Sequence, residues 1–127
     1  MPPKRSETLT EAELRVMNVL WTRGASTVQQ VLEVLPKELD LAYNSVLTTI
    51  RVLENKGYVE HTKESRAHIY RPIVAREEAR SFEVRHLVNR FFGNSHESLL
   101  LNLLEDTNLD PDELNRLRRM LQGEDGQ

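Results

Sequence analysis

The chain has 127 residues, 39% hydrophobic and 29% charged, which suits one compact domain or a small domain with a helical extension. It has no cysteine, which excludes a disulfide framework, cysteine-ligated zinc or copper, and thiol catalysis. The net charge of −3 does not exclude a nucleic-acid partner, because residues 1–75 hold ten Lys/Arg against nine Asp/Glu and only residues 76–127 are acidic, with seven against eleven.

The first predicted helix begins at Thr10. Thr10 and Glu13 have the spacing of a capping box, in which each side chain bonds the backbone amide of the other residue. Apolar residues then recur at helical spacing in Leu14, Met17, Leu20 and Trp21. Gly24 is the expected end of the helix, and we expect the helix to bury this stripe.

Two more helices follow. A short one begins at Ser26-Thr27 with the same capping chemistry and cannot pass Pro36. A longer one is expected over residues 42–56, with Gly57 as its C-terminal cap. Its apolar stripe consists of Val46, Ile50 and Leu53, and its polar face carries Asn44, Ser45, Thr48, Thr49 and Arg51.

From Tyr58 the periodicity changes from helical to alternating. Residues 58–63 and 68–71 are rich in β-branched and aromatic side chains, and the polar residues 64–66 between them predict a hairpin tip. Pro72 ends the second strand. Three helices followed by a hairpin is the order of a winged helix-turn-helix, which reads DNA with its third helix.

The last third of the chain predicts three further helices. A long one is expected over residues 75–92, a leucine-dense one follows the Gly93-Asn94 interruption, and Asp110-Pro111 starts the last. They hold too few residues for a core of their own, so we expect their leucines to pack against a second copy of the chain. The expected contacts are Leu87, Phe91, Leu99, Leu100, Leu103, Leu104, Leu114, Leu117 and Leu121.

The predicted fold is therefore mainly α with a small β-hairpin wing. Residues 1–74 form a winged-helix DNA-binding domain and residues 75–127 a helical dimerisation domain. Short side chains near the start of the third helix suit a major groove, and Arg51 is available to read guanine. On the wing, Lys63, Arg66 and His68 are the expected clamp on the DNA backbone.

The chain resembles the penicillinase-repressor (BlaI/MecI) family of bacterial transcriptional repressors over residues 9–121. The resemblance lies in LTEAELRVMNVLW, YNSVLTTIRVLENKGYV, KESRAHIYRP, LVNRFFGNSHESLLLNLLED and LDPDELNRL. It implies a homodimer that binds an inverted-repeat operator and blocks transcription. Relatives often carry glycine at the wing tip, where this chain has Ser65, and an Arg-Leu pair at the end of the third helix, where it has Val52-Leu53.

The resemblance also implies a route of release. Members controlled by a membrane-bound β-lactam sensor are cleaved in the first leucine-rich dimerisation helix, between an Asn and an apolar residue. Asn102 and Leu103 match that bond, which makes a membrane sensor protease a candidate partner. The copper-responsive branch carries a cysteine-rich hook, and a chain without cysteine cannot sense copper in that way.

Other functions find less support. No glycine-rich phosphate loop, nucleophile beside a base or paired carboxylates indicate an enzyme. The four histidines lack ligand spacing, so we expect no metal and no cofactor. Two alternatives stay open: a winged helix used as a protein-interaction module, which predicts an apolar or acidic third-helix surface, and a ligand-responsive regulator. The chain has no apolar run near the roughly 20 residues that span a bilayer and no signal-peptide core, so we expect a cytoplasmic protein without membrane insertion.

Overall fold

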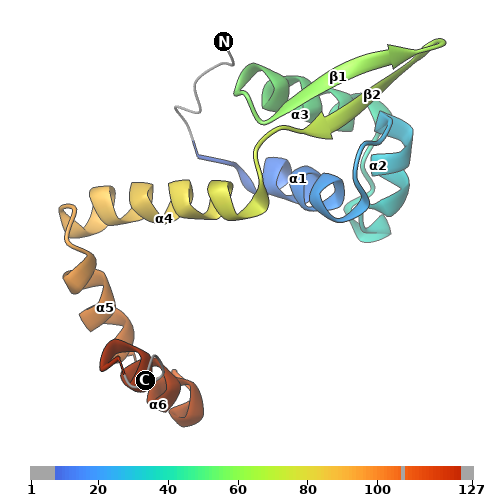
Figure 1. The fold of residues 1–127 in the computed structure, drawn as a ribbon. Helices are drawn as coiled ribbons and strands as arrows, with labels where there is room; N and C mark the ends of the chain where they lie inside the picture. The colour runs from blue at the N-terminus through green and yellow to red at the C-terminus, as the bar shows by residue number, and fades with distance from the viewer. Residues whose placement is uncertain (1–7, 107, 124–127) are drawn as a thin grey trace. The chain divides into compact units, whose positions relative to one another are not determined.

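The structure is a computed structural model that describes residues 8–106 and 108–123. Its first part consists of helices α1 (Glu11–Arg23), α2 (Val28–Val34), the short 3-10 helix η1 (Lys37–Leu39) and α3 (Tyr43–Asn55), then strands β1 (Val59–Glu64) and β2 (Ala67–Pro72). Helices α4 (Arg76–Phe92), α5 (His96–Leu104) and α6 (Pro111–Leu121) follow. Three helices and an antiparallel hairpin beside α3 form the predicted winged helix (Figure 1).

The chain divides into two compact units, Met1–Glu83 and Val84–Gln127. The division falls inside α4, so the first two turns of this helix belong with the winged helix. Ala79, in that part of α4, is 1% exposed and is a member of the winged-helix core.

Local capping chemistry explains where the first helices begin and end. Thr10 and Glu13 form the predicted capping box, with bonds of 2.9 and 3.2 Å. Thr27 and Gln30 form a second box at the start of α2. After α3, Gly57 adopts φ 87°, a left-handed conformation that favours glycine, and the chain turns into β1.

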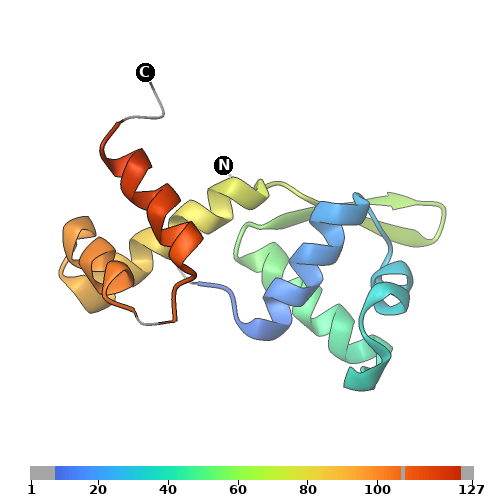
Figure 2. The same ribbon diagram turned by 90° about the horizontal axis from the view of Figure 1, so that it is seen from below.

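The hairpin is antiparallel, with Val59 opposite Pro72 and Lys63 opposite His68. Ser26 forms an isolated antiparallel β-bridge with β2, because its N–H and C=O both bond Tyr70 at 2.8 Å. The sequence predicted Ser26 only as part of a helix start. This bridge ties the segment before α2 to β2. Figure 2 shows the ribbon from below, with the hairpin and the helices of the first unit.

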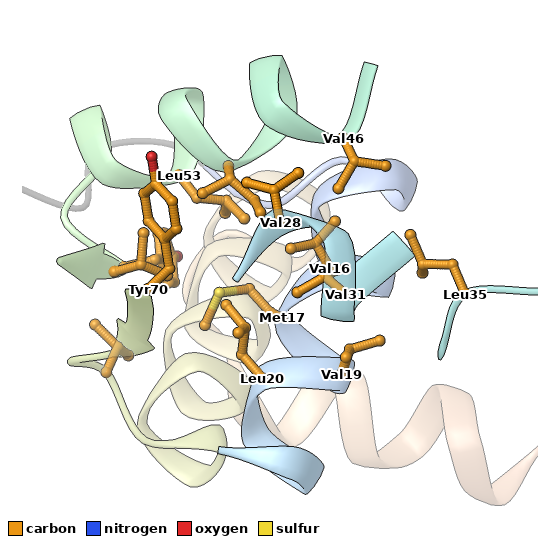
Figure 3. Packing of buried hydrophobic residues seen from close by; sticks show 14 of the residues in the cluster. Val16, Met17, Val19, Leu20, Val28, Val31, Leu35, Val46, Leu53 and Tyr70 are labelled. Atoms are coloured by element: carbon orange, nitrogen blue, oxygen red, sulfur yellow. The ribbon is translucent and has the colours of Figure 1, made fainter. Parts of the chain in front are cut away.

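The core of the first unit lies between the three helices and the base of the hairpin (Figure 3). It is built from Val16, Met17, Val19, Leu20, Val28, Val31, Leu35, Val46, Ile50, Leu53, Tyr58, Val59, Tyr70, Val74 and Ala79. The predicted stripe of α3 is confirmed, since its three apolar residues are at most 2% exposed.

One prediction for α1 is wrong. Leu14 was expected on the buried stripe but is 38% exposed, whereas its neighbour Glu13 is only 6% exposed. The Glu13 carboxylate accepts a hydrogen bond from the Thr10 N–H and pairs with the Lys56 ammonium at 2.8 Å. These partners compensate the charge and allow a carboxylate to occupy the buried side of the helix.

The second unit also follows its sequence signals. Gly93 and Asn94 both adopt positive φ and end α4, Ser95 caps α5, and Asp110 caps α6 with Pro111 at its first position. Neither α5 nor α6 contains a buried residue. Across residues 8–106 and 108–123, none of the helices has the length and apolarity needed to cross a bilayer.

Candidate nucleic-acid interface

The outer ridge of α3 carries three of the predicted contacts. Asn44, Thr48 and Arg51 follow one another at spacings of four and three residues, which places them on one line of the helix. All three are exposed, and they lie opposite the buried stripe. A continuous polar ridge on an otherwise anchored helix is the geometry that a major groove accepts.

Ser45 and Thr49 lie to one side of this ridge. The Thr49 hydroxyl donates to the Ser45 carbonyl at 3.0 Å, and Thr49 is partly buried. Both residues border a small apolar hollow with Leu35 and Leu41. Since its hydroxyl proton is already used within the helix, Thr49 is less available to a ligand than Thr48.

On the other side of the ridge, a groove of about 470 Å³ separates α3 from the wing. It is lined by Thr27, Val28, Gln29, Tyr43, Leu47, Arg51, Arg66, Ala67, His68 and Tyr70. The groove therefore brings together three predicted contacts that are distant in sequence: Arg51 from α3 and Arg66 and His68 from the wing.

Three polar residues of the groove were missed by the sequence analysis: Thr27, Gln29 and Tyr43. Tyr43 is 46% exposed and precedes Asn44 directly, so an exposed aromatic residue at the start of the predicted reading helix was an available signal. Thr27 and Gln29 lie in the groove because α2 starts beside the wing, next to the bridge between Ser26 and Tyr70. No local pattern in the sequence predicts this bridge.

The wing presents its predicted residues to solvent. Lys63, Arg66 and His68 are all exposed, and Ser65 at the tip adopts φ 55°. The rings of His61 and His68 stack across the hairpin with centroids 4.7 Å apart. His61 Nδ1 lies 2.7 Å from Glu54 Oε2, which joins the wing to the last turn of α3.

Ion pairing decides which cations remain available to a ligand. Lys56 is paired with Glu13, and Arg71 with Glu60 at 2.7 Å. Within residues 8–106 and 108–123, no carboxylate forms an ion pair with Arg51, Lys63 or Arg66. The cations of the groove and the wing tip are therefore unneutralised within that range, although the chain as a whole is acidic.

At the floor of the groove, burial raises the pKa of the Tyr70 hydroxyl above its ordinary value. Glu54 and Tyr43 act in the same direction, while Arg51 lowers it. The hydroxyl thus stays protonated at neutral pH and carries no negative charge into the groove. Figure 3 shows Tyr70 reaching from β2 toward α3.

The other predicted sites lie in the second unit. Asn102 and Leu103 are both exposed and lie in the last turns of α5, so the bond between them is helical. Of the predicted dimer contacts, Leu87, Phe91, Leu100, Leu103 and Leu121 are 40–68% exposed and Leu99, Leu104, Leu114 and Leu117 are partly buried. Leu101, at 53% exposed, was not among them.

In the described part of the chain, no group of three His, Cys, Asp or Glu side chains is placed to hold a metal ion. The stacked wing histidines, one of which faces Glu54, do not form such a group.

Comparison with known proteins identifies relatives over almost the whole chain. The family described as "Penicillinase repressor" matches residues 9–123. The penicillinase repressor of Bacillus licheniformis is 29% identical over 94% of this chain and 93% of its own length. The transcriptional regulator BlaI of Mycobacterium tuberculosis is 35% identical over 89% of this chain and 82% of its own length.

A solved structure supports the fold of the first unit. The solution structure of the DNA-binding domain of the repressor BlaI matches with a TM-score of 0.52 and 27% identity, covering 61% of this chain and 93% of that one. The methicillin resistance regulatory protein MecI of Staphylococcus aureus is 25% identical over 89% of this chain. The resemblance predicted from the sequence motifs is confirmed.

Proposed function

Because the chain belongs to the penicillinase-repressor family, whose members repress transcription and are not enzymes, we propose that it is a homodimeric repressor that binds an inverted-repeat DNA operator. The observation that carries the proposal is the groove between α3 and the wing, bordered by Arg51 and Arg66 without carboxylate partners among the described residues. Unpaired cations around a polar helical ridge suit a duplex, whose surface is a row of phosphates.

Within this interface the side chains have different roles. Asn44, Thr48 and Arg51 enter the major groove, where Arg51 binds the O6 and N7 atoms of a guanine. Lys63, Arg66 and His68 contact the phosphate backbone from the wing. Ser45 and Thr49 lie at the edge of the contact, and the three groove residues missed by the sequence analysis extend it toward α2.

Dimerisation is assigned to the helices within residues 75–127. The support comes from α5 and α6, which have no buried residue although their leucines are numerous and several are more than 40% exposed. Large apolar side chains exposed in this number mark an interaction site, and a second copy of the same helices covers them symmetrically. Residues 1–74 supply the DNA-binding domain.

Release from DNA proceeds by proteolysis in this interface. Cleavage between Asn102 and Leu103 divides α5 and separates α6 from the rest of the chain. Two half-sites bound through one dimer gain from high effective concentration, which is lost when the protomers separate. The partner that cuts is a membrane sensor protease of the kind that regulates related repressors.

The test measures DNA binding by fluorescence anisotropy as salt is raised. The operator is first obtained by selecting bound fragments from random duplexes. Arg51→Ala should weaken binding by about 1–3 kcal/mol and relax the preference for one base, whereas Arg66→Ala should weaken binding to all sequences and reduce the salt dependence.

Arg71→Ala is the matched control, because Arg71 lies on the same hairpin but is paired with Glu60. Identical behaviour of the Arg51 and Arg66 variants would refute the division between base reading and phosphate contact. Failure of the full chain to select any sequence would favour a protein-interaction module instead.

A further inference from the structure

The first two turns of α4 are attached to the winged helix at two separate places. At the start, Trp21 Nε1 donates to the Val74 carbonyl at 2.8 Å, and the Arg76 guanidinium donates to the Thr22 hydroxyl at 3.1 Å. The guanidinium also lies over the Trp21 ring, 5.5 Å from its centroid. These contacts fix the beginning of α4 to the C-terminal end of α1.

The second attachment is at Glu83. Its carboxylate accepts a hydrogen bond from the backbone N–H of Leu9 at 2.8 Å, and Leu9 packs against the core. Arg76 and Glu83 are about 10 Å apart along the helix axis, at 1.5 Å per residue. A helix held at one point can swing, whereas two points at this distance fix the direction of these first two turns with respect to α1.

The segment that meets Glu83 is in turn bound to the reading helix. The Lys56 ammonium, at the C-terminal end of α3, donates to the Thr8 carbonyl at 3.1 Å and to Glu13 Oε1 at 2.8 Å. The same Glu13 oxygen accepts from the Thr10 N–H at 2.9 Å. Residues 8–10 thus link α4 to the end of α3 through a continuous set of polar bonds.

We propose that Glu83 is a positioning residue that fixes the direction of α4 with respect to α3, and thereby the half-site spacing that the dimer accepts. The inference rests on the proposed function, since it requires a dimer formed beyond Glu83 and DNA reading by α3. Exposed apolar residues begin directly after Glu83, with Val84 at 43% and Leu87 at 42%.

If the hydrogen bond between Glu83 and Leu9 is lost, the second turn of α4 is no longer held against the winged helix. Each winged helix of the dimer then samples more positions around the dimer axis. The effective concentration of the second half-site contact then falls at the preferred spacing and rises at other spacings. A single winged helix on a single half-site is unaffected, because Glu83 lies outside the groove and the α3 ridge.

The experiment compares three variants of the full chain. Glu83→Ala removes the acceptor for the Leu9 N–H, while Glu83→Gln keeps a side-chain carbonyl oxygen at that place. Glu77→Ala is the matched control, an exposed glutamate in the first turn of the same helix. Binding is measured to duplexes with one half-site and to duplexes whose two half-sites are at the preferred distance or are moved by a few base pairs.

Wild-type protein should discriminate steeply between spacings. Glu83→Ala should reduce this discrimination by about tenfold, the equilibrium factor expected from one hydrogen bond to a charged group, with unchanged affinity for a single half-site. Glu83→Gln should recover most of the discrimination, and Glu77→Ala should match wild type.

A Glu83→Ala protein with wild-type spacing preference overturns the inference and leaves the proposed function intact. Loss of single half-site binding, or unfolding seen by circular dichroism, also overturns it, since Glu83 would then support the fold alone. A wild-type chain that is monomeric by analytical ultracentrifugation and indifferent to a second half-site would refute the proposed function itself.

Discussion

Replacing Glu13 by leucine should destabilise the winged-helix unit by about 3–5 kcal/mol, the usual cost of removing one partner of a buried ion pair. The side chains of Glu13 and Lys56 are only 8% and 13% exposed, and their charged atoms lie 2.8 Å apart. Without Glu13 the buried ammonium retains only the Thr8 carbonyl, and the Thr10 N–H loses its acceptor. Against a typical stability of about 5–15 kcal/mol for a domain, this loss is large.

The double variant Glu13→Leu, Lys56→Met should be more stable than either single variant. It removes both charges and fills their space with apolar groups, so only the bonds to Thr8 and Thr10 are lost, at about 1–3 kcal/mol. The coupling free energy of the double-mutant cycle should therefore be favourable by about 3 kcal/mol, the upper end of the range found for groups in one network.

The assay is urea denaturation of the full chain followed by tryptophan fluorescence. Trp21 is the single tryptophan of the chain and packs against the winged-helix core, so its emission reports on this unit. Glu11→Gln, an exposed glutamate of the same first turn, should change the unfolding free energy by less than about 0.5 kcal/mol. A Glu13→Leu cost below about 1 kcal/mol, or a double variant less stable than both single variants, would refute the reasoning.

Three further outcomes are expected. Ser65→Gly should raise the unfolding free energy by about 1 kcal/mol because Ser65 holds φ 55°, and a drop in the urea midpoint would contradict this. A fragment of residues 1–83 should be monomeric in analytical ultracentrifugation and more stable than one of residues 1–74, and dimerisation as strong as that of the full chain would place the interface elsewhere. Cutting at a protease site engineered between Asn102 and Leu103 should abolish tight operator binding while circular dichroism shows the N-terminal fragment still folded, and unchanged affinity after complete cleavage would rule out release by proteolysis.

The helix boundaries could be predicted because they depend on chemistry within a few residues. The capping box at Thr10, the positive φ of Gly57 and the Asp110 cap of α6 each involve partners next to one another in the sequence. The residues on the buried face of α1 were harder to predict from the sequence. Glu13 is buried because of Lys56, which is 43 positions away, and no local pattern indicates that pair.

The groove was predictable only in part for the same reason. Arg51 and Arg66 were found from their place on a predicted reading helix and a predicted hairpin tip. Gln29 was not, because its position depends on the bridge between Ser26 and Tyr70. The first turns of α4 present a similar case, since Glu83 reads in the sequence as one more exposed glutamate and acquires its role from the Leu9 amide.

The number of basic side chains that remain unpaired also depends on ion pairs between residues distant in the sequence. Residues 41–75 hold five basic and three acidic side chains, a modest excess that says little about affinity. Lys56 and Arg71 are the basic residues with carboxylate partners, and both lie outside the groove. The remaining three, Arg51, Lys63 and Arg66, are exposed on the α3 ridge and the outer wing, the surface proposed to bind the phosphate backbone. Selective neutralisation of the other cations thus leaves the unpaired positive charges at the proposed reading face, and this local charge is compatible with a polyanionic partner even though the net charge of the chain is −3.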